Sequence, residues 1–161
     1  MTDPSPDPFS DTRRAEETFR LQPAPDWVER AEIPWDTPAA PDDHVVALLV
    51  HTQWAPEKSL RHERSVRRFV SREAVQKLSQ VELEWDPEIE NLIIHDLGIW
   101  RQGVKRDLTE RSRFLLRQRE GAFEQQLVHG RMSALVLLDD VRPGDVVELE
   151  FSILSQARLP G

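Results

Sequence analysis

Three aspartates lie close together near the end of the sequence, in the stretch LDDVRPGDVVELEFSI at residues 138–153. Grouped carboxylates could bind calcium or exchange protons, and a calcium loop alternates its oxygen ligands as in D-x-[DN]-x-[DN]-G. Here Asp139 and Asp140 are adjacent and are separated from Asp145 by Val-Arg-Pro-Gly, which is the wrong spacing for such a loop. Proline followed by glycine favours a tight turn, in which aspartates accept backbone N–H groups. The stretch therefore predicts a connection between two antiparallel strands.

Other carboxylates occur in pairs. Glu82 and Glu84 lie in QVELEWD, and Glu148 and Glu150 lie in DVVELEFSI. A glycoside hydrolase needs two carboxyl groups on opposite sides of a cleft, whereas a spacing of two residues puts both groups on one face of a strand. Because the residues between them are apolar, we expect both pairs to lie on solvent-facing sides of strands.

The histidines show no metal-binding pattern. The sequence has five histidines and no cysteine. No two histidines have the i, i+4 spacing that would place two ligands on one helix face, and without cysteine there is no disulfide, zinc–thiolate site or thiol nucleophile. A histidine pair assembled from two distant strands stays open as an alternative to ordinary surface or packed histidines. Nucleophile-elbow, phosphate-loop and H-E-x-x-H motifs are also missing, so the sequence predicts no catalytic residues, no metal and no other cofactor.

Arginines concentrate in the stretch LRHERSVRRFVSR, residues 60–72. They could pair with the abundant glutamates across strands, or they could contact an acidic partner such as another domain of the same polypeptide. The net charge of −8 and the pI of about 5.1 argue against nucleic-acid binding. The predicted interaction face comprises Arg61, Arg64, Arg67, Arg68 and Trp100.

Short apolar or alternating runs indicate the strands that position these residues. Apolar residues that alternate with polar ones indicate a strand with one buried face, and short continuous apolar runs indicate a buried strand. Within residues 91–108, Gln102-Gly103 predicts a tight turn between two strands. The expected strands lie at residues 45–50, 80–86, 91–108 (two strands), 131–140 and 145–153.

One helix is predicted at residues 71–79, with Ser71 as its N-cap. Residues 60–71 and 109–120 fit more than one pattern. Strand follows strand without a regular βαβ order, which favours antiparallel sheets. We therefore expect a mainly β protein, an antiparallel β-sandwich of about seven to nine strands with one or two short helices.

The N-terminal region differs in composition from the rest. Eight of the 12 prolines and 11 of the 29 acidic residues fall within the first 43 residues. Residues 1–18 are predicted to be a disordered, acidic, Pro-rich tail. Residues 19–43 are predicted to be an extended strap that leads into a core at residues 44–155, so that residues 19–161 form a single domain. The residues expected to pin the strap are Leu21, Trp27, Val28, Ile33 and Trp35.

Three stretches together resemble a known family. They are FRLQPAPDWV (19–28), residues 61–107 with LSQVELEWDP and LIIHDLGIWRQG, and LLDDVRPGDVVELEFSI (137–153). In order and spacing they are similar to the domain of unknown function at the N-terminus of bacterial transglutaminase-like proteins. The resemblance implies a β-sandwich module that precedes a papain-like catalytic domain with a Cys-His-Asp triad. This chain has no cysteine, so no member of that triad can be assigned to any position here.

Two functions compete on this basis. The first is a non-catalytic accessory or interaction domain, not itself an enzyme, that precedes and supports a transglutaminase-like catalytic domain or binds a protein or peptide partner. The alternative is a stand-alone carbohydrate- or peptide-binding β-sandwich, or a carboxylate-dependent hydrolase. No run approaches the roughly 18 apolar residues of a membrane span, and the N-terminus lacks the apolar region of a signal peptide. The sequence as written predicts a bacterial cytoplasmic location, whereas the resemblance points to export into the periplasm.

Overall fold

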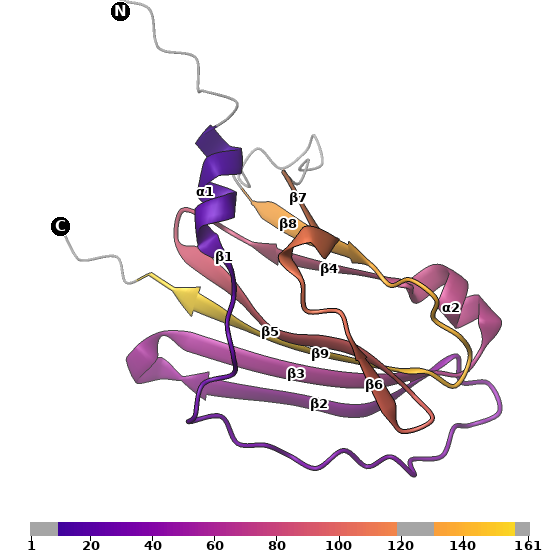
Figure 1. Ribbon diagram of the computed structural model, residues 1–161. Coiled ribbons are helices and arrows are strands. Elements are labelled where there is room, and N and C mark those ends of the chain that lie inside the picture. Colours follow the sequence, from indigo (N-terminus) through magenta and orange to yellow (C-terminus); the bar gives the residue numbers. More distant parts are fainter. Residues whose placement is uncertain (1–9, 119–130, 157–161) are drawn as a thin grey trace, which may run out of the picture.

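The computed structural model describes residues 10–118 and 131–156 (Figure 1). Within these ranges the chain forms nine strands and two short α-helices, α1 (Ser10–Thr18) and α2 (Arg72–Leu78). No helix in the described ranges is both long and apolar enough to cross a membrane. The strands are β1 (Phe19–Leu21), β2 (Val45–Ala55), β3 (Leu60–Phe69), β4 (Gln80–Trp85), β5 (Glu90–Arg101), β6 (Val104–Asp107), β7 (Phe114–Gln118), β8 (Met132–Leu137) and β9 (Val146–Ser155).

The strands make two sheets that face one another. The larger sheet has six strands in the order β1-β5-β9-β3-β2, with β6 paired to β5, and the smaller has the order β4-β8-β7. All pairs are antiparallel except β1 with β5. The predicted mainly β sandwich is confirmed. The two ambiguous stretches resolve as strand β3 and as a 3-10 turn, η2 (Arg111–Arg113), followed by β7.

The main core lies between the two sheets, where the alternation in β9 turns four apolar side chains inward as predicted. Val147, Leu149, Phe151 and Ile153 all belong to this core. Because residues directly opposite in an antiparallel pair share a face, the partners of Leu149 on β5 and β3 face inward with it. Burial of this one face accounts for the period of two in the sequence.

Short sequence patterns correctly predicted the start of α2 and the turn between β5 and β6. Ser71 caps α2, since its hydroxyl accepts a hydrogen bond from the backbone N–H of Ala74 at 3.0 Å. Gln102 and Gly103 form the turn between β5 and β6, with φ values of 51° and 77°. Positive φ at both central residues is what a two-residue turn of the primed type requires.

The stretch with three aspartates is a turn, but it does not make a hairpin. Asp145 donates its N–H to the carbonyl of Arg142 at 3.0 Å, and Gly144 has a φ of 95°, as expected for a Pro-Gly turn. The strands that it joins belong to different sheets, since β8 lies in the smaller sheet and β9 in the larger. The expectation of two adjacent antiparallel strands here is therefore wrong.

Helix α1 occupies residues for which the sequence predicted disorder. Ser10–Thr18 are helical, and the rest of the predicted tail, residues 1–9, lies outside the described residues. The C-terminal carbonyls of a helix need partners, and Arg111 donates to one of them, the carbonyl of Glu16, at 2.8 Å. Arg111 also donates to the carbonyl of Phe19, the first residue of β1, at 2.7 Å. Ala15 is wholly buried against the core. The helix thus depends on a residue almost a hundred positions away.

The strap leaves β1 and runs without regular structure along the outer face of the larger sheet, the face turned away from β4 (Figure 1). Val28 is buried, and Ile33 packs on a second apolar cluster formed by β2, β3 and β9. Trp35 stays 43% exposed but meets Trp100 edge-on, with ring centroids 5.2 Å apart. The strap therefore covers a face of the sheet that would otherwise be open to water.

We expect Phe19→Ala to destabilise the protein strongly. Phe19 is 1% exposed and lies between Trp85 and Phe114, with ring centroids 6.0 and 5.3 Å away. Removing a buried ring leaves a cavity and typically costs about 3–5 kcal/mol in the free energy of unfolding, measured here by urea denaturation. Leu115→Ala, at a residue 60% exposed on β7, is the control and should change that free energy little. Equal effects from both changes would contradict the assigned core.

Candidate functional site

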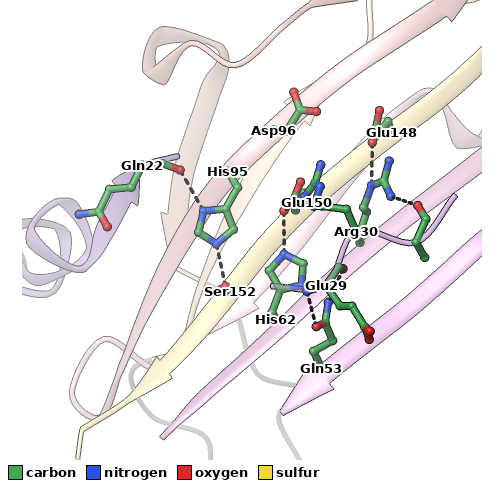
Figure 2. Close-up of polar contacts among 12 residues, drawn as sticks. Gln22, Glu29, Arg30, Gln53, His62, His95, Asp96, Glu148, Glu150 and Ser152 are labelled. Atoms are coloured by element: carbon green, nitrogen blue, oxygen red, sulfur yellow. Dashed lines mark hydrogen bonds and ion pairs between the residues drawn. The ribbon is translucent and has the colours of Figure 1, made fainter. Parts of the chain in front are cut away.

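A group of charged and polar side chains lies on the outer face of the larger sheet, beneath the strap (Figure 2). The strands β3, β9 and β5 lie side by side here, and their outward side chains meet those of the strap and of β6. We call this group the outer-face network. Its members are Arg30, His62, Arg64, His95, Asp96, Trp100, Lys105, Glu148, Glu150 and Ser152.

Glu148 and Glu150 are buried, which contradicts their predicted place on a solvent-facing side. They are 2% and 1% exposed, although they point away from the core between the sheets as the alternation requires. The strap covers them, and an alternating strand gives no sign of such a cover. The other predicted pair does face solvent: Glu82 is exposed and Glu84 partly so, and each contacts an arginine.

Glu150 accepts hydrogen bonds from two bases that come from different segments. His62 Nε2 lies 2.8 Å from its Oε1, and Arg30 of the strap lies 2.5 Å from the same oxygen. Burial by itself would raise the pKa of this carboxyl group, but the hydrogen bonds from His62 and Arg30 outweigh burial and lower the pKa to about 2. Glu150 is therefore a carboxylate at neutral pH and ties the strap to the sheet.

Glu148 is held in the same way by three donors. Arg64 Nε donates to its Oε2 at 2.8 Å and Trp100 Nε1 to its Oε1 at 3.0 Å, while Lys105 lies 3.3 Å from the same Oε1. Burial would raise the pKa of Glu148, but these donors hold it below its usual range. Burial likewise opposes the charge on Lys105, yet its contact with Asp96 raises the lysine's pKa. Both groups are charged, so Glu148 is a buried anion with its charge balanced.

Side chains of the sheet provide hydrogen bonds for the strap backbone. A segment without regular structure must satisfy its backbone groups in other ways. Arg64 donates to the carbonyl of Ala31 at 2.8 Å, and Arg68 donates to the carbonyl of Thr37 at 2.6 Å. Gln53 exchanges two hydrogen bonds with the backbone of Glu29, at 2.8 and 3.0 Å. Arg64 and Arg68 of β3 thus act as anchors for the strap.

His95 and Ser152 have the distance of a nucleophile and its base. His95 Nε2 lies 2.7 Å from Ser152 Oγ, and His95 Nδ1 lies 2.9 Å from the carbonyl of Gln22 (Figure 2). Burial lowers the pKa of His95, so the ring is neutral at pH 7. Nδ1–H then donates to the carbonyl, and Nε2 accepts the serine hydroxyl.

The surroundings of this pair are not those of a hydrolase. A serine nucleophile must be reached by the substrate carbonyl, and preorganised donors must face the oxyanion. Ser152 is 0% exposed. The histidine is instead oriented by the carbonyl of Gln22, the residue that follows β1 at the start of the strap. The arrangement fits a second anchor point for the strap better than a catalytic dyad.

The two histidines of the network come from distant strands and lie together. The rings of His62 and His95 are stacked with centroids 5.6 Å apart. The structure therefore contains a histidine pair from two distant strands, which the sequence had left open. The pair does not chelate, because the two Nε2 atoms bond to Glu150 and Ser152. Among the described residues, no group of three or more histidine and acidic side chains could hold a metal ion.

The five predicted interaction residues do not share one face. Arg64, Arg68 and Trp100 lie on the outer face under the strap, where their donors are used internally. Arg61 and Arg67 point to the opposite face and are exposed. The structure therefore divides the arginine stretch into strap anchors and exposed cations on the other face of the sheet.

Sequence reasoning did not find the anchoring role of the network, although one signal for it was present. Along β3 several outward residues are basic, as in His62 and Arg64, and along β9 two outward residues, Glu148 and Glu150, are acidic. In the observed register, Arg64 stands directly opposite Glu150. Complementary charges on the same parity of two strands indicate pairing. Without the register, which only the fold supplies, that signal cannot be told from two independent solvated faces.

Asp145 shows the same use of a buried carboxylate at the turn before β9. It is 2% exposed and accepts from Arg101 at 3.0 and 2.8 Å and from the N–H of Arg142 at 2.8 Å. Burial would raise the pKa of Asp145, but these donors lower it. The carboxylate fixes the turn and the end of β5, which confirms its predicted role in a connection.

The pKa of Glu150 predicts a specific loss of stability in acid. Its folded-state pKa of about 2 is below the ordinary value of 4.5, so its contribution is complete above pH 4.5 and is lost as the pH falls toward 2. Between pH 5 and pH 3, the free energy of unfolding should fall in the wild type by about 1–2 kcal/mol more than in Glu150→Gln. Urea denaturation at each pH measures the difference. Glu57→Gln, at an exposed residue of η1 (Pro56–Lys58), should follow the wild type. Parallel curves for wild type and Glu150→Gln would contradict the assignment.

Arg64→Met should loosen the strap as well as destabilise the fold. The change leaves buried Glu148 without one of its donors and removes the bond to Ala31, which together should cost about 2–4 kcal/mol. Hydrogen exchange of strap amides should accelerate relative to amides of β9. Arg67→Met lies on the same strand with its side chain on the other face, and should leave exchange of the strap unchanged. Equal strap exchange in the two variants would show that Arg64 is not an anchor.

Comparison with known proteins places this fold in a family. The sequence profile of DUF3857, described as a domain of unknown function with a solved structure, matches residues 55–161. No curated protein matches the chain. The fold is similar to a crystal structure of a protein from Parabacteroides distasonis that is named a putative protease, with a TM-score of 0.54 and 14% identity.

That likeness covers 63% of this chain and 20% of the other, so the chain spans about a fifth of that protein's length. At this identity the comparison bears on the fold alone. The profile match extends from the end of β2 to residue 161, and thus includes most of the chain and every member of the outer-face network except Arg30. The chain therefore belongs to the DUF3857 family.

Proposed function

We propose that this chain is a non-catalytic accessory domain that precedes and supports a transglutaminase-like catalytic domain. The observation that carries this proposal is the use of the polar network. Its His–Glu and Ser–His pairs, which resemble catalytic pairs in distance, lie under the strap and bond to it. Groups that hold the strap in place are not available to a substrate.

The likeness to part of a longer protein supports the same proposal. The similar structure is about five times longer than the region it shares with this chain, and it is named a putative protease. A papain-like protease needs a cysteine nucleophile, and this chain has no cysteine. In the proposed arrangement a neighbouring papain-like domain supplies the Cys-His-Asp chemistry. The sandwich supplies a rigid surface that positions it or its substrate.

The rigidity of the domain suits such a role. Interfaces that position a second domain need a fixed surface, and the strap is fixed by the ion pair of Arg30 with Glu150 on β9 and by hydrogen bonds between its backbone and side chains of β2, β3 and β5. Arg61 and Arg67 add exposed positive charge to an acidic chain. Contact with an acidic surface of a catalytic domain is the interaction that these residues favour.

The alternative of a carboxylate-dependent hydrolase has less support. Glu150 is bonded to His62, and both Glu150 and Glu148 are ion-paired and buried. A stand-alone binding sandwich keeps one observation in its favour, an open groove of about 280 Å³ between β4 and β3. Carbohydrate binding would use an exposed tryptophan such as Trp54, which is 56% exposed.

Activity measurements test the non-catalytic part. The purified chain is incubated with casein and a fluorescent primary amine, with peptide cleavage and amine incorporation followed together. We expect neither product above the buffer blank. His95→Ala and Ser152→Ala are assayed beside it. Turnover by the wild-type chain that disappears in either variant would overturn the proposal, because it would make the Ser–His pair catalytic.

Binding measurements test the accessory part. The test partner is the papain-like domain that the proposal places after this chain in one polypeptide. With its cysteine changed to alanine, it is titrated with the chain by calorimetry. We expect one-to-one binding that weakens as salt is added, because charge contacts are screened. Arg61→Glu with Arg67→Glu should weaken it, and Glu57→Gln should not. Failure of the two domains to bind would count against the accessory role.

A further inference from the structure

The larger sheet ends at β2, and β2 lacks the residues that usually protect a sheet edge (Figure 1). Edge strands commonly carry lysine, other charges or proline, which prevent another strand from pairing. The 11 residues of β2 include no lysine, arginine, aspartate, glutamate or proline, in a chain of which 31% is charged. Val50 and Trp54 on this strand are 57% and 56% exposed. This edge is therefore uncharged, apolar and open to water.

The hydrogen bonds of β3 show which residues of β2 face the sheet. In an antiparallel pair, alternate residues direct both N–H and C=O toward the same neighbour. Ser155 of β9 donates to the carbonyl of Ser59 at 2.8 Å. Phe69 of β3 donates to the carbonyl of Asp145 at 2.9 Å. The pairing of β3 with β9 is regular between these points, so odd-numbered residues of β3 bond to β9 and even-numbered residues bond to β2.

Three residues of β2 present free backbone groups at the edge. Gln53 stands opposite His62, an even-numbered residue, so its N–H and C=O groups turn toward β3. In the same alternation, Val50, Thr52 and Trp54 turn theirs to the far edge. In the described part of the chain, no strand pairs with β2 on that side. Unpaired edges of this kind accept an added strand.

The free stretch is short and is bounded at both ends. A bulge interrupts β2 between Ala47 and Leu49. Pro56, which has no N–H to donate, follows the last residue of the strand. The regular part of the edge therefore covers residues 49–55, and a strand that pairs with it must fit within these limits.

We propose that two copies of this chain associate through the free edges of β2, antiparallel and with a twofold axis at Thr52, so that their larger sheets become one. Thr52 then stands opposite its counterpart, and Val50 stands opposite Trp54 of the second copy. Each of the three pairs exchanges two backbone hydrogen bonds. A shift by two residues would bring Trp54 against the bulge or Val50 against Pro56, so this register alone uses all three free residues.

The side chains of β2 fit a second copy of the same strand. A β-branched residue opposite an aromatic one is a favourable cross-strand pair, and the twofold axis produces that pair twice. The charged residues that share this face lie one strand away on β3, where Glu63 stands opposite Thr52. The Glu63 side chains of two copies would be three strand spacings apart, about 14 Å, which exceeds the screening length of about 10 Å at 0.1 M salt. No like charges therefore oppose the pairing at close range.

This inference goes beyond the proposed function, and salt distinguishes the two. Docking on an acidic surface should weaken as salt is added, whereas two chains of net charge −8 repel one another, so their association should strengthen. Sedimentation equilibrium of the purified chain measures association between about 10 µM and about 1 mM, the range suited to a small interface. We expect a reversible monomer–dimer equilibrium. A monomer at every concentration and salt would overturn the inference.

Hydrogen exchange measured by NMR locates the contact residue by residue. The amides of Val50, Thr52 and Trp54 should exchange more slowly as the concentration of the chain rises, because they gain partners in the dimer. The amides of His51 and Gln53 already bond to β3 and should change little. Protection of all five amides alike, or of none, would contradict pairing at this edge.

Charge exchange tests the register. Val50→Glu should weaken association by about tenfold or more, because it places a carboxylate against an indole ring. Adding Trp54→Lys to Val50→Glu should restore association, since the new charges meet across the twofold axis. Within one chain they are four residues apart along a strand, about 13 Å, which is too far for an ion pair. Val50→Lys with Trp54→Lys is the matched control and should stay monomeric. Equal association of the two double variants would rule out this register.

Proline tests the backbone ladder. Thr52→Pro removes an N–H that the second copy needs but no bond between β2 and β3, and proline is tolerated where the N–H of an edge strand faces solvent. It should abolish the dimer, whereas Thr52→Val, which keeps the N–H, should retain it. Leu137→Lys, at a residue 60% exposed on the central strand of the smaller sheet, should leave association unchanged. Dimers of Thr52→Pro as stable as those of Thr52→Val would show that the strands do not pair.

Discussion

The pairing of two buried carboxylates with bases from three separate segments is the constraint on which the strap-covered half of this protein depends. Glu148 and Glu150 lie on the central strand β9, under a strap that has no regular structure of its own. A buried carboxylate without a partner is strongly destabilising, so the strap cannot leave without exposing Arg30 and opening a bond of Glu150. The charges do not add much free energy beyond an apolar contact of the same size. They fix where the strap lies, because only one alignment satisfies them all.

Because these polar groups hold the strap, a pair of side chains at the distance of a catalytic pair need not be catalytic. The Ser152–His95 and His62–Glu150 distances are those of hydrogen bonds in many active sites, but a hydrogen bond has the same length whether it orients a base or holds a strap. The two roles differ in whether a substrate can reach the pair and in which third group bonds to it. Here the third partners are Gln22 and Arg30, both of which belong to the strap. The function proposed for the domain follows from that assignment, since it leaves the chemistry to another domain.

The two faces of the larger sheet are covered by different parts of the chain and to different extents. On the outer face the strap covers the polar residues, and each charged group there has a partner. On the inner face the smaller sheet covers β5 and β9 but stops before β3 and β2. Arg61 and Arg67 differ from Arg64 and Arg68 only by parity along one strand. Yet the first pair is exposed and bonds to no side chain in the part of the molecule that the structure describes, whereas the second pair anchors the strap. One stretch of sequence thus serves both the stability of the domain and the surface offered to a partner.

The sequence alone determined those strands whose residues alternate clearly, because a strand that buries one face must alternate. The runs at β4 and β9, the Gln102-Gly103 turn and the Ser71 cap each follow from interactions within a few residues. It could not decide what covers the second face of a strand, since alternation records only that the two faces differ. Burial of Glu150, helix formation at residues 10–18 and the crossing of the Pro143-Gly144 turn between sheets all depend on contacts between distant segments. Those contacts exist only once the register of the strands and the path of the strap are set, and that is a property of the folded chain.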